Sequence, residues 1–198
     1  MCLQKDMFKL RTYQKQIYSN YADDASKYDM EHKLKIERIY SMLKSFMTNK
    51  VKRIIFKDIE NNENKRSSKY ADEFDYLVSS GISLVAPAIS EPKYPLTISV
   101  NKNLIKLYYS DVGILSFLIF NNDVMSILFN DKGTNLGSIY ETAAAMELCA
   151  HGKEIFYFDS KKVGEVDFLI NDYNNREVLP IEIKSGKDQT NFRAIPKL

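Results

Sequence analysis

Two apolar segments near the C-terminus carry their charged residues on one face each. Residues 165–170 and 178–184 alternate as β-strands do, and a turn-rich stretch joins them. Alternation places Asp167 on one face of the first strand, and Glu182 with Lys184 on one face of the second. We therefore expect a hairpin that brings these three side chains into one space. Strict alternation also predicts an opposite face made of Val166, Phe168 and Ile170.

Two carboxylates and a lysine in this arrangement suit the hydrolysis of a phosphodiester. That reaction uses a hard cation to activate water and to neutralise charge, and Mg²⁺ or Mn²⁺ prefers oxygen ligands. Asp167, Glu182 and the backbone carbonyl of Ile183 would supply such ligands. Lys184 would orient the attacking water or stabilise developing negative charge. The alternative is a hairpin whose outer face carries ordinary solvated charges.

An alanine-rich segment, residues 136–150, is predicted to be a helix that ends near Gly152. Glu141 lies on an otherwise apolar stripe of this helix, which is unusual for an acid. Two explanations stay open. Ser138 and Glu141 fit a capping box, in which the glutamate bonds the start of the helix. Considered together with Asp167 and the second strand, Glu141 is better explained as a further member of the metal site.

The upstream sequence predicts helices followed by short strands. Amphipathic helices are expected over residues 32–46 and from Tyr70 to a left-handed cap at Gly81. Short apolar runs over residues 82–89 and 96–100 come next. Two helices before a β-hairpin outline a winged helix.

A further helix is expected after residue 100, where Asp111 is placed to cap residues 114–119. We divide the chain into a helical connector, a winged-helix-like domain and a nuclease-like domain, over residues 1–30, 31–100 and 101–198.

A small basic group lies near the predicted winged helix. Lys65, Arg66 and Lys69 would contact DNA phosphates there, although a solvated loop explains the same residues. The chain has 28 Lys plus Arg against 26 Asp plus Glu, a formal charge of +2. Because this net charge is small, any basic surface must be local.

Cysteine and hydropathy patterns exclude several classes of protein. Cys2 and Cys149 stand far apart, which supports neither a disulfide framework nor a cysteine zinc site. The first ten residues lack the apolar stretch of a signal peptide, and no apolar run is long enough to span a bilayer. We expect a cytoplasmic protein without membrane partners.

The acidic segments resemble those of a known family. They are similar to the C-terminal module of predicted prokaryotic AAA+ ATPases, a PD-(D/E)xK nuclease-like domain of unknown function, over Gly137–Glu141, Gly164–Phe168 and Pro180–Lys187. The resemblance extends upstream through Lys106–Leu115 and the stretch ending at Pro95, and so covers most of the chain. It implies an α/β fold in which a winged-helix-like segment precedes a restriction-endonuclease-like mixed sheet flanked by helices.

The resemblance also assigns roles to single residues. Glu141 would be the family's helix acid, Asp167 its strand acid, and Glu182 with Lys184 its E-x-K pair. The implied function is Mg²⁺-dependent cleavage of DNA. The alternative is a non-catalytic DNA-binding or protein-interaction module coupled to an AAA+ ATPase.

Two departures from the family pattern bear on these expectations. The chain has no G-x-x-x-x-G-K-[ST] stretch, so it would not bind ATP through a P-loop, and the ATPase would be a separate module or partner. Residue 198 comes only fourteen residues after Lys184, whereas the family fold continues with a helix and a strand. We therefore expect a sheet truncated on its C-terminal side.

Overall fold

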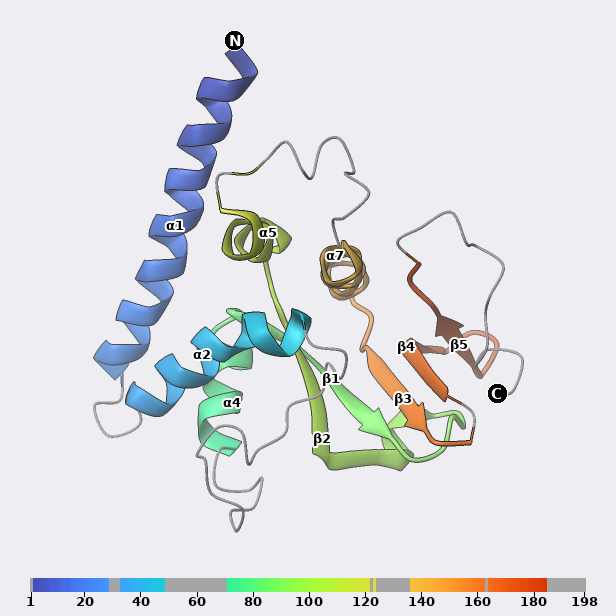
Figure 1. The fold of residues 1–198 in the computed structure, drawn as a ribbon. Coiled ribbons are helices and arrows are strands. Elements are labelled where there is room, and N and C mark those ends of the chain that lie inside the picture. Colours follow the sequence, from blue (N-terminus) through green and yellow to red (C-terminus); the bar gives the residue numbers. More distant parts are fainter. Residues whose placement is uncertain are drawn as a thin grey trace.

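The structure is a computed structural model that describes residues 2–28, 33–48, 71–121, 123, 136–162 and 164–184. Its five strands form one mixed sheet in the order β2-β1-β3-β4-β5 (Figure 1). The strands are β1 (Ser83–Ile89), β2 (Val100–Tyr109), β3 (Phe156–Ser160), β4 (Gly164–Asp172) and β5 (Glu177–Ile181). β1 runs parallel to β3, and the other neighbouring pairs are antiparallel.

The described helices are α1 (Cys2–Tyr28), α2 (Lys33–Thr48), α4 (Ala71–Ser79), α5 (Val112–Phe120) and α7 (Gly137–Ala150). α7 lies over the sheet and packs beside α5 (Figure 1). The expected α/β class, with helices flanking a mixed sheet, is therefore confirmed. β1, which we expected in the winged helix, is hydrogen-bonded into the sheet that also contains β2–β5. The domain boundaries at residues 30 and 100 stay predictions.

Local signals placed most of these elements correctly. Gly81 ends the α4 region with φ of +72°, a left-handed conformation that suits glycine. α2 presents Ile36, Ile39 and Leu43 to the core at helical spacing, which is the amphipathic pattern expected for this segment.

The core consists of two clusters. The larger one joins α2, α4, α5 and α7 to the sheet, and it includes the buried residues Leu43, Leu107, Tyr109 and Phe168. The smaller one lies around β3 and β4 and contains Leu96, Phe156, Phe158, Val166 and Leu169.

The predicted strand over residues 96–100 is wrong. Leu96–Ser99 instead form a short 3-10 helix, η2, and β2 begins only at Val100. The side chain of Leu96 is buried, and its backbone N–H donates a 3.0 Å hydrogen bond to Oδ1 of Asn171. A tertiary contact to β4 therefore fixes the backbone of this segment.

The structure does not keep Val166, Phe168 and Ile170 on one face of β4, as strict alternation predicted. Phe168 and Ile170 belong to the larger core cluster, whereas Val166 belongs to the smaller one with Leu169. The cause is a register shift in the pairing of β3 with β4, between Phe156 and Phe158. An extra residue at such a point turns all later side chains to the other face.

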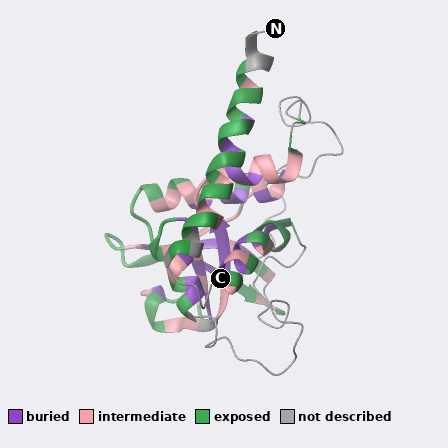
Figure 2. Cartoon of the chain, turned by 90° about the vertical axis from the view of Figure 1, so that its left-hand side faces the viewer, coloured by how far each residue is buried: buried purple, intermediate pink, exposed green. Residues whose placement is uncertain are grey.

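α1 packs along the body of the protein on one side and is exposed along most of its length (Figure 2). Its buried Arg11 donates to Oγ of Ser116 on α5 at 3.2 Å, and Tyr18 stacks on Tyr40 of α2. The N-terminal segment is thus helical, as expected. None of the described helices combines the length and the apolar character required to cross a membrane.

Asp111 caps α5, as the sequence predicted: its Oδ1 accepts a 2.6 Å hydrogen bond from the N–H of Gly113. Asp111→Ala should lower the free energy of unfolding by about 1 kcal/mol, because the first turn of α5 loses this acceptor. Asp111→Asn keeps an acceptor oxygen and should cost less. Urea denaturation of both variants measures the difference, and equal losses would contradict a capping role.

Candidate functional site

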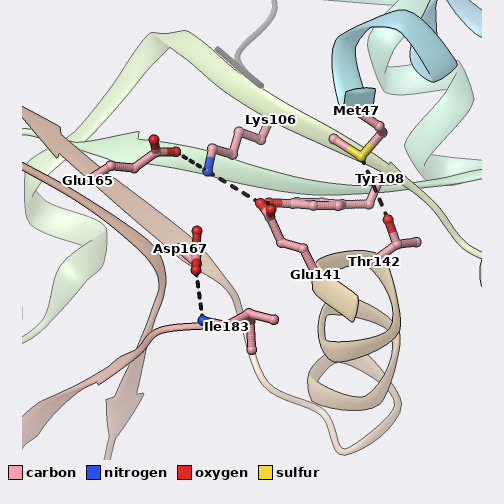
Figure 3. A network of polar contacts seen from close by, with 8 residues as sticks. All are labelled: Met47, Lys106, Tyr108, Glu141, Thr142, Glu165, Asp167 and Ile183. Atoms are coloured by element: carbon pink, nitrogen blue, oxygen red, sulfur yellow. Dashed lines mark hydrogen bonds and ion pairs between the residues drawn. The ribbon is translucent and has the colours of Figure 1, made fainter. Parts of the chain in front are cut away.

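A buried lysine lies at the centre of a cluster of acidic side chains. Lys106 on β2 is 1 % exposed, and its Nζ lies 2.6 Å from Oε1 of Glu165 and 3.5 Å from Oε1 of Glu141 (Figure 3). The same Nζ lies 4.8 Å from the ring centroid of Tyr157, within the range of a cation–π contact. Burial alone would lower the pKa of Lys106, but Glu141, Glu165 and Asp167 outweigh it and raise the pKa.

The path of the Lys106 side chain depends on small neighbours. Lys106 pairs with Ala86 on β1, and Ala88, two residues along, pairs with Tyr157 on β3. Side chains two residues apart share a face, so both alanines lie on the face that Lys106 crosses. Their methyl groups leave room for the lysine to extend over β1 and reach Glu165 on β4.

Glu141 is directed from α7 into this cluster. It is 2 % exposed, and its Oε1 accepts a 2.7 Å hydrogen bond from the hydroxyl of Tyr108 on β2. The capping-box explanation is wrong, because α7 begins at Gly137 with Leu136 as its N-cap, and no side chain caps it. Ser138 is therefore already inside the helix, and Glu141 contacts β2 instead.

Asp167 lies on β4, where its carboxylate points toward the backbone of Ile183 (Figure 3). The N–H of Ile183 donates a 2.8 Å hydrogen bond to its Oδ2. Burial, followed by the negative charge of Glu141 and a smaller contribution from Glu182, raises the pKa of Asp167 to about 6. The hydrogen bond from Ile183 and the charge of Lys106 oppose this shift without cancelling it.

Glu182 and Lys184 follow β5, which ends at Ile181, so the predicted strand over residues 178–184 is three residues too long. Beyond the last pair of β4 with β5, Phe168 with Ile181, the carboxylate of Asp167 accepts the N–H of Ile183. The ammonium of Lys184 pairs with Oε1 of Glu182. Oε2 of Glu182 is buried and has no hydrogen-bond partner among the described residues.

The cluster carries more negative than positive charge. Its four carboxylates belong to Glu141, Glu165, Asp167 and Glu182, and its two ammonium groups belong to Lys106 and Lys184. The formal balance is −2 when all six groups are ionised. In the described parts of the chain, no three His, Cys, Asp or Glu side chains are placed together so that they could hold a metal ion.

The chemistry of the cluster nevertheless fits a divalent cation. Three features favour additional positive charge: an excess of two negative charges, a carboxylate whose pKa is raised by burial and by neighbouring negative charge, and the buried Oε2 of Glu182, which has no hydrogen-bond partner among the described residues. Mg²⁺ and Mn²⁺ take carboxylate oxygens of this kind. Asp167 and Glu182 would hold such an ion, and the carbonyl of Ile183 as a further ligand stays a prediction.

The sequence predicts Glu141, Asp167 and Glu182 as members of the site, but not Glu165 or Lys106. Lys106 and Tyr108 belong to the family-like segment Lys106–Leu115, from which no role follows for them. The available signal is the position of Lys106 between Ile105 and Leu107, within the otherwise apolar stretch 104–109 of β2. The predicted DNA-contacting residues, Lys65, Arg66 and Lys69, lie outside the described residues, as does the rest of segment 49–70.

Fold and site together define an α/β protein with a lysine-centred acidic cluster on a mixed sheet. The chain belongs to the family described as a domain of unknown function, DUF8612, whose model matches residues 3–124. Residues 136–195 match a second domain of unknown function, DUF4143. Neither the curated proteins nor the solved structures provide a match to this chain. Lys106 lies in the first matched region and the four acids lie in the second, so the two regions build the cluster jointly.

Proposed function

We propose that this chain is a metal-dependent phosphodiesterase module of the PD-(D/E)xK, restriction-endonuclease-like class, and that it acts on DNA. The observation that carries the proposal is the half-buried carboxylate of Asp167, which lies near enough to Glu141 and Glu182 for the negative charge of each to raise its pKa. Such a concentration of acids is costly without a cation and is typical of functional sites.

In this proposal the residues have distinct roles. Asp167 and Glu182 bind Mg²⁺ or Mn²⁺, which when bound supplies an activated water and neutralises charge on the phosphate. The Ile183 N–H fixes the orientation of the Asp167 carboxylate through its 2.8 Å hydrogen bond. Lys184, held by Glu182, presents its ammonium to the developing negative charge. Glu141, whose Oε1 accepts the hydroxyl of Tyr108, would provide a further carboxylate for the same ion.

A second candidate is a non-catalytic DNA-binding or protein-interaction module that works with an AAA+ ATPase. Lys106 favours it, because its ammonium already neutralises part of the cluster without a metal ion. The two candidates differ in one measurable property, which is the cleavage of DNA in the presence of Mn²⁺ or Mg²⁺.

Plasmid nicking tests the proposed activity. We expect wild-type protein with Mn²⁺ to convert supercoiled plasmid to the nicked form, and Glu182→Gln to lower that rate about a hundredfold or more, because a metal-binding charge is lost. Glu177→Gln is the matched control, since Glu177 is an exposed acid at the other end of β5. Equal nicking by Glu182→Gln and wild type would indicate a contaminating nuclease, and no nicking by wild type would favour the non-catalytic module.

A further inference from the structure

The buried ammonium of Lys106 pairs with the buried carboxylate of Glu141 inside the acidic cluster. We propose that Lys106 is a built-in cation that competes with a divalent ion for the carboxylate of Glu141 and thereby limits the metal affinity of the site. This inference rests on the proposed function, since it concerns the same acidic cluster.

The contacts of Lys106 favour this role over that of an ordinary surface ion pair. Its Nζ lies 2.6 Å from Glu165 and 3.5 Å from Glu141, and its side chain is 1 % exposed. Charges this deeply buried are weakly screened by solvent and salt. The aromatic face of Tyr157 and the small residues Ala86 and Ala88 line its path, so the ammonium is held inside the cluster.

Electrostatics explains why the two cations would compete. A divalent ion bound to Glu141 would lie next to the ammonium, and like charges repel strongly in a buried setting. The two partners of Lys106 are not equivalent, because Glu165 is nearer and its side chain is 43 % exposed, whereas that of Glu141 is 2 % exposed. When Glu141 binds a metal ion, Lys106 would remain paired with Glu165. The cluster thus has one arrangement without metal and another with it.

Replacement of Lys106 tests the competition. Lys106→Met keeps the length of the side chain and removes its charge, so we expect the affinity for Mn²⁺ alone, measured by calorimetry and by the EPR signal of free Mn²⁺, to rise about tenfold or more. The matched control is Lys93→Met, because Lys93 is an exposed lysine that pairs with Glu91. Its Mn²⁺ affinity should equal that of wild type.

A charge-matched double variant distinguishes the proposed competition from misfolding and from a simple change in the charge of the cluster. Lys106→Met with Glu165→Gln removes an ammonium and its nearest carboxylate together, so the formal charge of the cluster stays at −2. The proposal predicts that this variant also binds Mn²⁺ more tightly than wild type, because Glu141 is released. If it folds and binds Mn²⁺ no more tightly than wild type, the inference is wrong.

The outcomes separate this inference from the proposed function. Tighter Mn²⁺ binding by the Lys106 variants, with no nicking of DNA by any form, would support the inference and contradict the phosphodiesterase. Unchanged or weaker binding by these variants, with Mn²⁺-dependent nicking by wild type, would contradict the inference alone. Absence of Mn²⁺ binding in every form would contradict both.

Discussion

Glu141→Ala should lower the free energy of unfolding by about 3 kcal/mol. The substitution removes the acceptor of the buried Tyr108 hydroxyl and one of the two carboxylates that face Lys106. A buried donor without a partner costs about 1–3 kcal/mol, and the loss of one partner of a buried ion pair adds to that cost. Because Glu165 still neutralises Lys106, we expect the combined loss to stay near the lower end for a buried pair. Urea denaturation followed by circular dichroism provides the measurement.

Two companion variants identify the cause of that loss. Glu147→Ala removes an exposed acid from the same helix and should change stability by less than about 0.5 kcal/mol. Glu141→Gln keeps an oxygen that can accept from Tyr108, so it should cost less than the alanine variant. It should also lower the pKa of Asp167, because the charge of Glu141 helps to raise it. If Glu141→Ala and Glu147→Ala are equally stable, the contacts of Glu141 do not hold the cluster together.

The elements that the sequence predicted correctly depend on local signals. Gly81 and the cap formed by Asp111 are specified by residues within a few positions of one another, and the helical spacing of α2 is likewise local. The errors occur where a distant residue decides the backbone. Asn171 bonds the backbone of Leu96, 75 residues away, and this contact favours η2 where an isolated strand was expected. The register shift in β4 likewise depends on its pairing with β3.

The acidic residues of the site were predictable because strand alternation and helix periodicity place them on defined faces. Alternation predicts that Asp167, Glu182 and Lys184 share one space, and in the structure Asp167 accepts the N–H of Ile183, in the segment that follows β5. The role of Lys106 was not predictable in this way. Its partners Glu141 and Glu165 lie on α7 and β4, and only the sheet order brings β2 within reach of them. A lysine inside an apolar stretch such as 104–109 indicates a buried partner without identifying it.

Asp167→Asn should raise the free energy of unfolding by about 3 kcal/mol at pH 8 in the absence of metal. Asparagine keeps an oxygen for the Ile183 N–H but removes a charge that the cluster disfavours. The native-state pKa of Asp167 is about 6, against an ordinary value of 3.8, and each unit of difference corresponds to about 1.4 kcal/mol. Chemical denaturation of wild type and variant between pH 4 and pH 8 measures the effect.

The sign of the pH dependence follows from proton binding. Between about pH 4 and pH 6 the native state holds the proton of Asp167 more tightly than the unfolded chain does, so this group makes wild type less stable as pH rises through that window. The advantage of Asp167→Asn should therefore be complete above pH 6 and vanish near pH 4. Glu177→Gln, which removes an exposed acid of β5, is the matched control for the loss of one negative charge. If Asp167→Asn is no more stable than wild type at pH 8, ionised Asp167 does not destabilise the native state.

Mn²⁺ should reverse the order of the two proteins if Asp167 is a metal ligand. A cation that binds only the native state stabilises it by mass action, and it favours the ionised form of Asp167. Wild type at pH 8 should thus gain stability as Mn²⁺ is added, whereas Asp167→Asn should gain little. A carboxylate that destabilises the native state in the absence of a cation, and stabilises it when a cation is bound, has the thermodynamic properties of a metal ligand. If Mn²⁺ stabilises both proteins equally, the ion binds elsewhere, and the destabilising effect of ionised Asp167 has no functional explanation.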